Sequence, residues 1–141
     1  MNKMESNTCY NTSCQSYQKW AIGNDVRAIL LSNANVSSMV GVDIYPLVAP
    51  ESVDGEFIVY QRDAYAKHAT KMGVFEDVCE LSLIAISDNY DSSVMLASAI
   101  DNALTGIHTL TDGKRVYMNL ITSSESFTDN KYMQKLTYEI K

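Results

Sequence analysis

The sequence contains few prolines and glycines and no long apolar run. Two prolines and six glycines occur in 141 residues, and each glycine stands apart from the others, so the chain has no glycine-rich loop for binding phosphate. No apolar stretch approaches the roughly 20 residues that a membrane-spanning helix needs. Residues 1–18 are polar and lack the apolar centre of a secretion sequence, so we expect a soluble protein that stays inside the cell.

Histidine and cysteine, which often serve as general bases and metal ligands, are also scarce. The two histidines, His68 and His108, have no sequence neighbour that suggests a catalytic triad or a metal pair, and we interpret both as exposed polar residues. Three cysteines are an odd number, which fits no closed disulfide framework. Cys79 lies in an apolar stretch and is predicted to be a small buried hydrophobe. Cys9 and Cys14 are predicted to be free thiols, and a disulfide or a metal between them is the alternative.

Carboxylates are plentiful, but their spacing predicts neither a catalytic pair nor a calcium loop. Glu76, Asp77 and Glu80 are the densest group near a strand, and such groups do acid–base work only when they converge in a cleft. We interpret them as the solvated start of a strand. The cluster at residues 88–91 lacks the ligand spacing of a calcium loop and is better explained as the start of a helix. The sequence therefore predicts no catalytic residue, no cofactor and no metal, in a protein that is not an enzyme.

The charge balance is acidic. Eleven Lys and Arg residues face seventeen Asp and Glu residues, which gives a formal net charge of −6. Duplex DNA is held largely by Lys and Arg side chains that displace counterions. We therefore expect no specific binding of nucleic acid.

The composition favours one folded domain with a polar N-terminal extension. Apolar residues make up 46% of the chain and charged residues 20%, which are ordinary values for a globular protein. A length of 141 residues suits one domain. We predict a flexible arm at residues 1–14, which are polar and non-periodic, and a single α+β domain at residues 15–141.

Apolar spacing predicts two helices. The first covers about residues 15–33 and the second about residues 91–105. Their inward-facing residues are predicted to be Ile22, Val26, Ile29, Leu30, Ala97, Ile100 and Leu104. A short helical turn at residues 36–40 follows the first helix, and Gly41 is a natural place for it to end.

Apolar runs and alternation predict four strands in two hairpins. The first hairpin joins residues 57–67 to residues 74–87, with a protruding tip near residues 66–73. The second joins residues 115–123 to residues 132–140. The density of apolar residues in 74–87 indicates a central strand that is covered on both faces.

The segment at residues 42–50 contains both prolines, Pro46 and Pro50, which exclude a central strand. We interpret it as an extended edge segment or a loop. The expected fold class is therefore α+β, with a mainly antiparallel four-stranded sheet made of two hairpins. Two helices pack on one face of this sheet, and the proline-containing segment follows the first helix.

Several short motifs occur in a distinctive order. They are the helix at 26–31 with the turn at 36–41, the tripeptide Ile44-Tyr45-Pro46 with Ala49-Pro50, the strand at 57–62, and the strand at 79–85 followed by residues 88–104. In this order they resemble the tail-completion, or tail-terminator, proteins of bacteriophages. The resemblance spans about residues 20–106 and a similar two-strand ending, and the longer polar N-terminus departs from it.

The resemblance implies a structural role in the virion, at the head-proximal end of the tail, after assembly in the host cytoplasm. Members of the family form a ring, commonly hexameric, that ends the growth of the tail tube and offers a surface to the head–tail connector proteins. Genomic DNA passes through the lumen without specific binding. The expected partners are therefore other copies of this chain, the tail tube protein, the connector proteins and passing DNA, with no membrane. A lumen lined by carboxylates would repel phosphate and let DNA slide.

Within such a ring, we expect the first hairpin, the N-terminal arm and the proline-containing segment to contact neighbouring subunits. The predicted contact residues are Tyr65, Ala66, Lys67, His68, Lys71, Met72, Tyr45 and Pro46.

Two alternatives remain open at this point. One is a head-completion or connector adaptor protein between portal and tail. The other is a small enzyme or ligand-binding domain that uses Glu76, Asp77, Glu80 and His68. The second alternative requires a large apolar pocket with converging polar groups.

Overall fold

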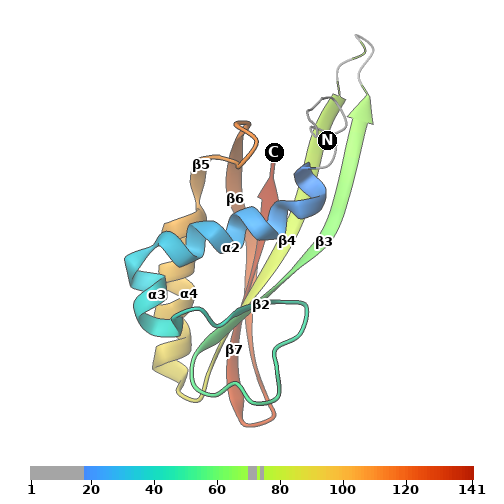
Figure 1. Cartoon of the computed structure of the whole chain (residues 1–141). Helices are drawn as coiled ribbons and strands as arrows, with labels where there is room; N and C mark the ends of the chain where they lie inside the picture. The colour runs from blue at the N-terminus through green and yellow to red at the C-terminus, as the bar shows by residue number, and fades with distance from the viewer. Residues whose placement is uncertain (1–17, 70–72, 74) are drawn as a thin grey trace.

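The structure, a computed structural model of the 141-residue chain, describes residues 18–69, 73 and 75–141 (Figure 1). The predicted arm at residues 1–14, with Cys9 and Cys14, lies outside the described residues. So do Lys71 and Met72 of the predicted contact set.

Within these residues the chain forms a short 3-10 turn, three α-helices and six strands. The helical elements are η1 (Gln18–Ala21), α2 (Ile22–Ser32), α3 (Ala34–Val40) and α4 (Tyr90–Leu104). The strands are β2 (Ile44–Pro46), β3 (Phe57–Ala69), β4 (Phe75–Ser87), β5 (Gly106–Thr109), β6 (Arg115–Thr128) and β7 (Lys131–Ile140). No helix among them is long and apolar enough to cross a membrane.

All six strands belong to one mixed sheet with the order β2-β3-β4-β7-β6-β5. Strand β2 pairs with β3 in parallel, and the other pairs are antiparallel. The predicted four-stranded antiparallel sheet with two helices is therefore wrong. The two hairpins are present at the centre of the sheet, but a short strand is added at each edge, and the predicted helical turn at 36–40 is part of a third helix, α3.

The additions escaped prediction because β2 and β5 have three and four residues, too few to show a period of two. Pro46 is tolerated in β2 because this strand lies at the edge of the sheet, where one side of its backbone needs no ladder partner. Residues 42–50 were expected to form an extended edge segment or a loop; residues 44–46 form the edge strand β2, and the others lie in no helix or strand.

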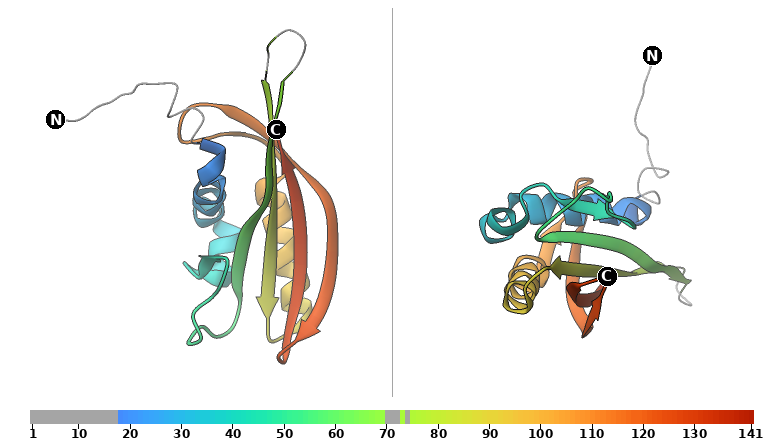
Figure 2. Two further views of the ribbon diagram at one scale, coloured as in Figure 1. Left: turned by 90° about the vertical axis from the view of Figure 1, so that its right-hand side faces the viewer. Right: turned by 90° about the horizontal axis from the view of Figure 1, so that it is seen from below.

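The sheet curls around the helices, as the two views in Figure 2 show. Both of its ends reach α2. At one end the Arg27 Nε donates to the carbonyl oxygen of Ile44 in β2 at 2.9 Å. At the other end the backbone N–H of Thr111, just after β5, donates to the carboxylate of Asp25 at 3.3 Å. The helices therefore fill the concave side of the sheet.

The core lies between this concave side and the three helices. Its fully buried side chains include Ile22, Val26, Leu30, Leu96, Ile100, Leu104, Leu81, Leu83, Tyr138 and Ile140. Burying one such aliphatic side chain stabilises the fold by about 1.5–3 kcal/mol. The predicted burial of Cys79 is confirmed, since none of its surface is exposed.

Two asparagines and a glycine set the helix boundaries. Asn33 adopts an extended conformation that ends α2, and its side chain accepts hydrogen bonds from the N–H groups of Asn35 and Val36 at the start of α3. Gly41, with φ of 60°, ends α3 where the sequence predicted. Asn89 caps α4 by accepting from the Ser92 N–H at 3.0 Å, so the polar cluster at 88–91 is a helix start.

Candidate functional site

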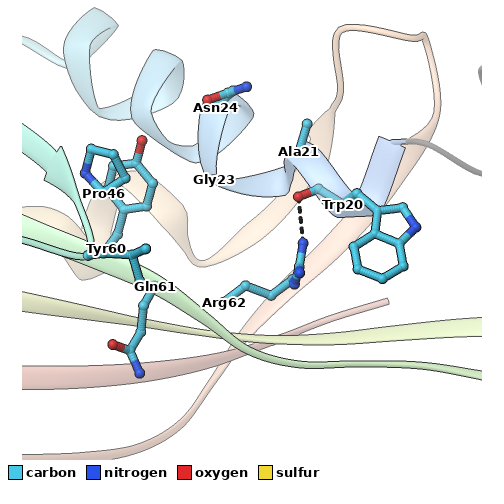
Figure 3. Close-up of a pocket in the computed structure, with 9 residues that line it drawn as sticks. Trp20, Ala21, Gly23, Asn24, Pro46, Tyr60, Gln61 and Arg62 are labelled. Carbon is cyan, nitrogen blue, oxygen red and sulfur yellow. Dashed lines mark hydrogen bonds between the residues drawn. The ribbon is translucent and has the colours of Figure 1, made fainter.

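A pocket of about 430 Å³ opens at the β2 edge of the sheet, between the start of the helical segment and strand β3 (Figure 3). Its lining comes from four elements and the residue after β2. These residues are Trp20, Ala21, Gly23, Asn24, Pro46, Leu47, Tyr60, Gln61 and Arg62. The lining includes no carboxylate.

The inner wall of the pocket depends on a close approach of α2 to β3. A Cβ atom on Gly23 would lie 2.6 Å from Cε2 of Tyr60, closer than real Cβ atoms come to other atoms. Only glycine lets the helix backbone lie on the ring at this distance. Tyr60 is almost fully buried beneath it, and this burial raises the pKa of its hydroxyl.

On the outer side of the pocket, an aromatic and cationic cluster joins η1 to the long strands. The Arg62 guanidinium lies 4.6 Å from the centre of the Trp20 ring, and its Nη1 donates to the Trp20 carbonyl oxygen at 2.6 Å (Figure 3). The Trp20 ring meets the Tyr65 ring edge to face at 5.3 Å between centres. Lys19 adds a bond from Nζ to the backbone oxygen of Asp77 at 2.8 Å. Trp20 is nevertheless 56% exposed, so its ring is available to a partner.

Tyr65 is fixed in this cluster by Asp77. Its hydroxyl donates to Oδ2 of Asp77 at 3.1 Å. Burial, and then this hydrogen bond, raise the pKa of Tyr65 to about 12. The side chain therefore remains a neutral donor at any ordinary pH.

The lip of the pocket is apolar and strained. Leu47 has φ of 65°, a left-handed conformation that costs a residue other than glycine roughly 1–2 kcal/mol. Its N–H donates to the Tyr60 carbonyl oxygen at 2.8 Å, and the chain then turns away from β3. Leu47 is 71% exposed and Val48 76% exposed. Strain combined with exposed apolar side chains is typical of a contact surface.

The structure brings parts of the predicted contact set together and leaves others apart. Pro46 lines the pocket, and Tyr65 meets Trp20 edge to face at its outer side. Tyr45 turns to Asp43, whose carboxylate accepts its hydroxyl at 2.7 Å. The residues Ala66, Lys67 and His68 lie farther along β3.

Trp20 and Arg62 connect the pocket at Pro46 to Tyr65 on β3, and neither was selected from the sequence. They are 42 positions apart, so no local pattern joins them. One clue was present, because Trp20 is the sole tryptophan of the chain and lies in a polar stretch. Tryptophan, tyrosine and arginine are the residues most enriched at the energetic centres of protein interfaces.

Two of the carboxylates proposed for the enzymatic alternative, Asp77 and Glu80, do not converge. Asp77 and Glu80 are three positions apart on β4, so they point to opposite faces of the sheet. In the part of the chain that the structure describes, no three His, Cys, Asp or Glu side chains are grouped as metal ligands. His108, predicted to be exposed, is half-buried, with Nε2 2.7 Å from the Leu104 carbonyl oxygen at the end of α4.

A second hollow, of about 550 Å³, lies between α3 and α4. Its lining contains no ionisable side chain and consists of Asn35, Ser38, Met39, Val94, Met95, Ser98, Ala99 and Asn102. Neither of these two hollows is lined by Asp77 or Glu80, and the side chains of Glu76 and His68 lie outside the described part of the chain.

Comparisons with known proteins give a likeness in structure and none in sequence. No known protein family matches the sequence, and no curated protein matches it either. Among solved structures, the fold is similar to that of a chain in the virion of a native gene transfer agent (GTA) particle, with a TM-score of 0.75. The likeness covers 88% of this chain and 96% of that chain at 18% sequence identity. At this identity it shows that the two chains share a fold.

Proposed function

We propose that this protein is a structural virion protein that forms a ring on the head-proximal end of a phage tail tube. The observation that carries the virion role is the fold shared with a chain of a gene transfer agent virion over nearly the full length of both chains. The narrower assignment to the tail rests on the order of sequence motifs around Ile44-Tyr45-Pro46. In this role the ring stops tube growth, joins the connector proteins and lets DNA pass.

The protruding ribbon of β3 and β4 supports a role in assembly (Figure 1). Strand β4 pairs with β7 from Cys79 onward, so residues 75–78 of β4 pair with β3 alone. A two-stranded ribbon without further support is marginally stable in water. A neighbouring subunit that packs against Tyr65, Ala66, Lys67 and His68 would supply the missing contacts.

The proposal gives the chain no catalytic role and no cofactor. Asp77 accepts a hydrogen bond from the Tyr65 hydroxyl, and Glu80 lies on the other face of β4. The linings of the two hollows described above contain no pair of carboxylates for acid–base chemistry.

An acidic lumen is a further part of the proposal. Glu80 of β4 and Glu139 of β7 are register partners, so their carboxylates lie side by side on the same face of the sheet. Facing a lumen, such pairs would repel phosphate. The double variant Glu80→Lys/Glu139→Lys should then bind duplex DNA in a salt-dependent manner, whereas the native protein should not. A ring seen by cryo-electron microscopy with a lumen lined mainly by Lys and Arg would contradict this part.

The function is tested by negative-stain microscopy of the purified full-length chain mixed with tail tubes assembled without heads. The expected result is rings in solution and caps on tube ends. Binding to tailless, DNA-filled heads in place of tubes would support the adaptor alternative. A protein that remains monomeric at high concentration and caps no tubes would overturn the proposal.

A further inference from the structure

The sheet leaves two long stretches of strand edge unpaired. On one side, β2 pairs with β3 only as far as Tyr60, so the outer edge of β3 from Gln61 onward meets no strand of the described part of the chain. On the other side, β5 pairs with β6 only as far as Met118, and the outer edge from Asn119 onward is likewise free of a described strand. Two different free edges on one molecule are what a head-to-tail contact between copies requires.

Both free edges carry a β-bulge at the same level of the sheet. The register shifts between Arg62 and Ala64 in β3, and between Leu120 and Thr122 in β6. Gln61 pairs with Ser82, Ser82 with Thr137, and Thr137 with Thr122, so one row of register partners crosses the sheet from edge to edge. Ile121 is therefore level with the pocket at Gln61 and Arg62.

The two bulges argue against continuous strand pairing between copies. A bulge interrupts the hydrogen-bond ladder and is a common guard on edge strands. It also redirects a side chain. In β6 the extra residue is Ile121, which is 48% exposed. An exposed branched aliphatic side chain at an interrupted edge is suited to insertion into a pocket.

We propose that Ile121 of one copy inserts into the pocket beside Trp20 and Arg62 of a second copy. The pocket lining includes Pro46, Tyr60 and Trp20, which offer apolar surface to an inserted side chain. Strands β3 and β6 run in opposite directions, because three antiparallel steps separate them. Rotation about an axis along the strands keeps each residue at the same position along that axis, so in this arrangement β6 of one copy can lie antiparallel beside β3 of the next.

The position along the strand direction distinguishes Ile121 from two other exposed apolar residues on this side of the sheet, Ile107 and Phe127. Ile107 pairs with Tyr117, which is four positions from Ile121 and so about 13 Å along the strand. Phe127 is six positions away in the other direction, about 20 Å from Ile121. In a closed ring whose axis runs along the strands, as proposed here, copies are not displaced along that axis, so of these three residues only Ile121 lies level with the pocket. This inference rests on the proposed ring and specifies how its subunits touch.

Site-specific cross-linking tests the contact. Two variants in a Cys9→Ser/Cys14→Ser background, one with Gln61→Cys and one with Ile121→Cys, are mixed and treated with a short bismaleimide. We expect a cross-linked dimer from the mixture and none from either variant alone. The matched control uses Ile107→Cys in place of Ile121→Cys. Ile107 is more exposed (61%) but lies about 13 Å from Ile121 along the strand, so this control should give no cross-linked dimer.

A substitution of Ile121 measures how much this contact contributes to assembly. Ile121→Asp should raise the concentration needed for half-assembly by roughly tenfold or more, as expected for a central apolar contact, while the melting temperature stays unchanged. Ile107→Asp should leave assembly unaffected. An assembled oligomer that shows no Gln61–Ile121 cross-link and tolerates Ile121→Asp overturns this inference and leaves the proposed function intact. A chain that never assembles and never caps tubes contradicts both.

Discussion

Gly23 in α2 and Tyr60 in β3 touch so closely that a methyl group on Gly23 would come within 2.6 Å of the tyrosine ring. This contact sets the distance between the first long helix and the sheet. It also forms the inner wall of the pocket at the sheet edge. A single glycine thus supports both the packing of the domain and the shape of its candidate contact surface.

Gly23→Ala should lower the free energy of unfolding by about 1–3 kcal/mol, because the helix or the buried Tyr60 ring must move. Alanine favours a helix over glycine by up to about 1 kcal/mol, which is too little to offset the overlap. Urea denaturation measures the change. Asn24→Ala is the matched control at the next, exposed position and should be neutral or slightly stabilising. A Gly23→Ala protein at least as stable as the native one would show that the contact is looser than described.

Asn89→Ala should destabilise the protein by about 1 kcal/mol, since the Ser92 N–H at the start of α4 loses its acceptor. Asn33→Ala should cost at least as much, because this side chain accepts from two N–H groups of α3. Asn89→Asp keeps an acceptor oxygen and should retain most of the stability. Thermal unfolding of the three variants checks this, and equal melting temperatures for Asn89→Ala and Asn89→Asp would refute the capping role.

Cys79 should be inert towards thiol reagents in the folded protein. Its side chain is fully buried, and this burial raises the pKa of the thiol to about 11, although Arg62 and Lys19 act in the opposite direction. In a Cys9→Ser/Cys14→Ser variant, we expect no labelling by a maleimide near pH 8 and complete labelling in denaturant. Fast labelling under native conditions would mean that β4 opens or that Cys79 is accessible.

Tyr65 should make the protein less stable in alkali. An unfolded tyrosine ionises near pH 10, whereas burial and the hydrogen bond to Asp77 raise the pKa of Tyr65 in the folded state to about 12. Between these values the folded state keeps a proton that the unfolded state loses, so stability falls as pH rises from about 10 to about 12. The contribution is fully present below pH 10. Urea midpoints across this range should fall less steeply for Tyr65→Phe, and identical slopes would refute the prediction.

The parts of the fold that could be predicted from the sequence are those in which apolar residues recur in a regular pattern, or in a dense run, over many positions. Ile22, Val26 and Leu30 mark α2, and the dense apolar run in β4 marks a central strand with Cys79 inside it. The predicted sheet was nevertheless wrong at both edges. Strand β2 exists because Asp43 and Leu47 bond to β3 from either end, which no local pattern encodes.

The candidate site was harder to predict than the fold. Pro46 and Tyr65 were selected through a family resemblance, but the residues between them were not. Trp20 and Arg62 meet only because η1 crosses β3 at the edge of the sheet. Ile121 is conspicuous only once a register shift shows it to be an extra residue in β6. Contacts of this kind depend on tertiary geometry.

The attachment of α2 to both ends of the curled sheet has a mechanical consequence. Arg27 binds the β2 end, and Asp25, two residues earlier on the same helix, binds Thr111 beyond β5. A load applied at one edge is therefore transmitted to the other through less than one helical turn. In the proposed ring, docking of a first neighbour at one edge would restrain the other edge before the second neighbour binds. Assembly should then be cooperative, with few partial rings between the free chain and the closed one.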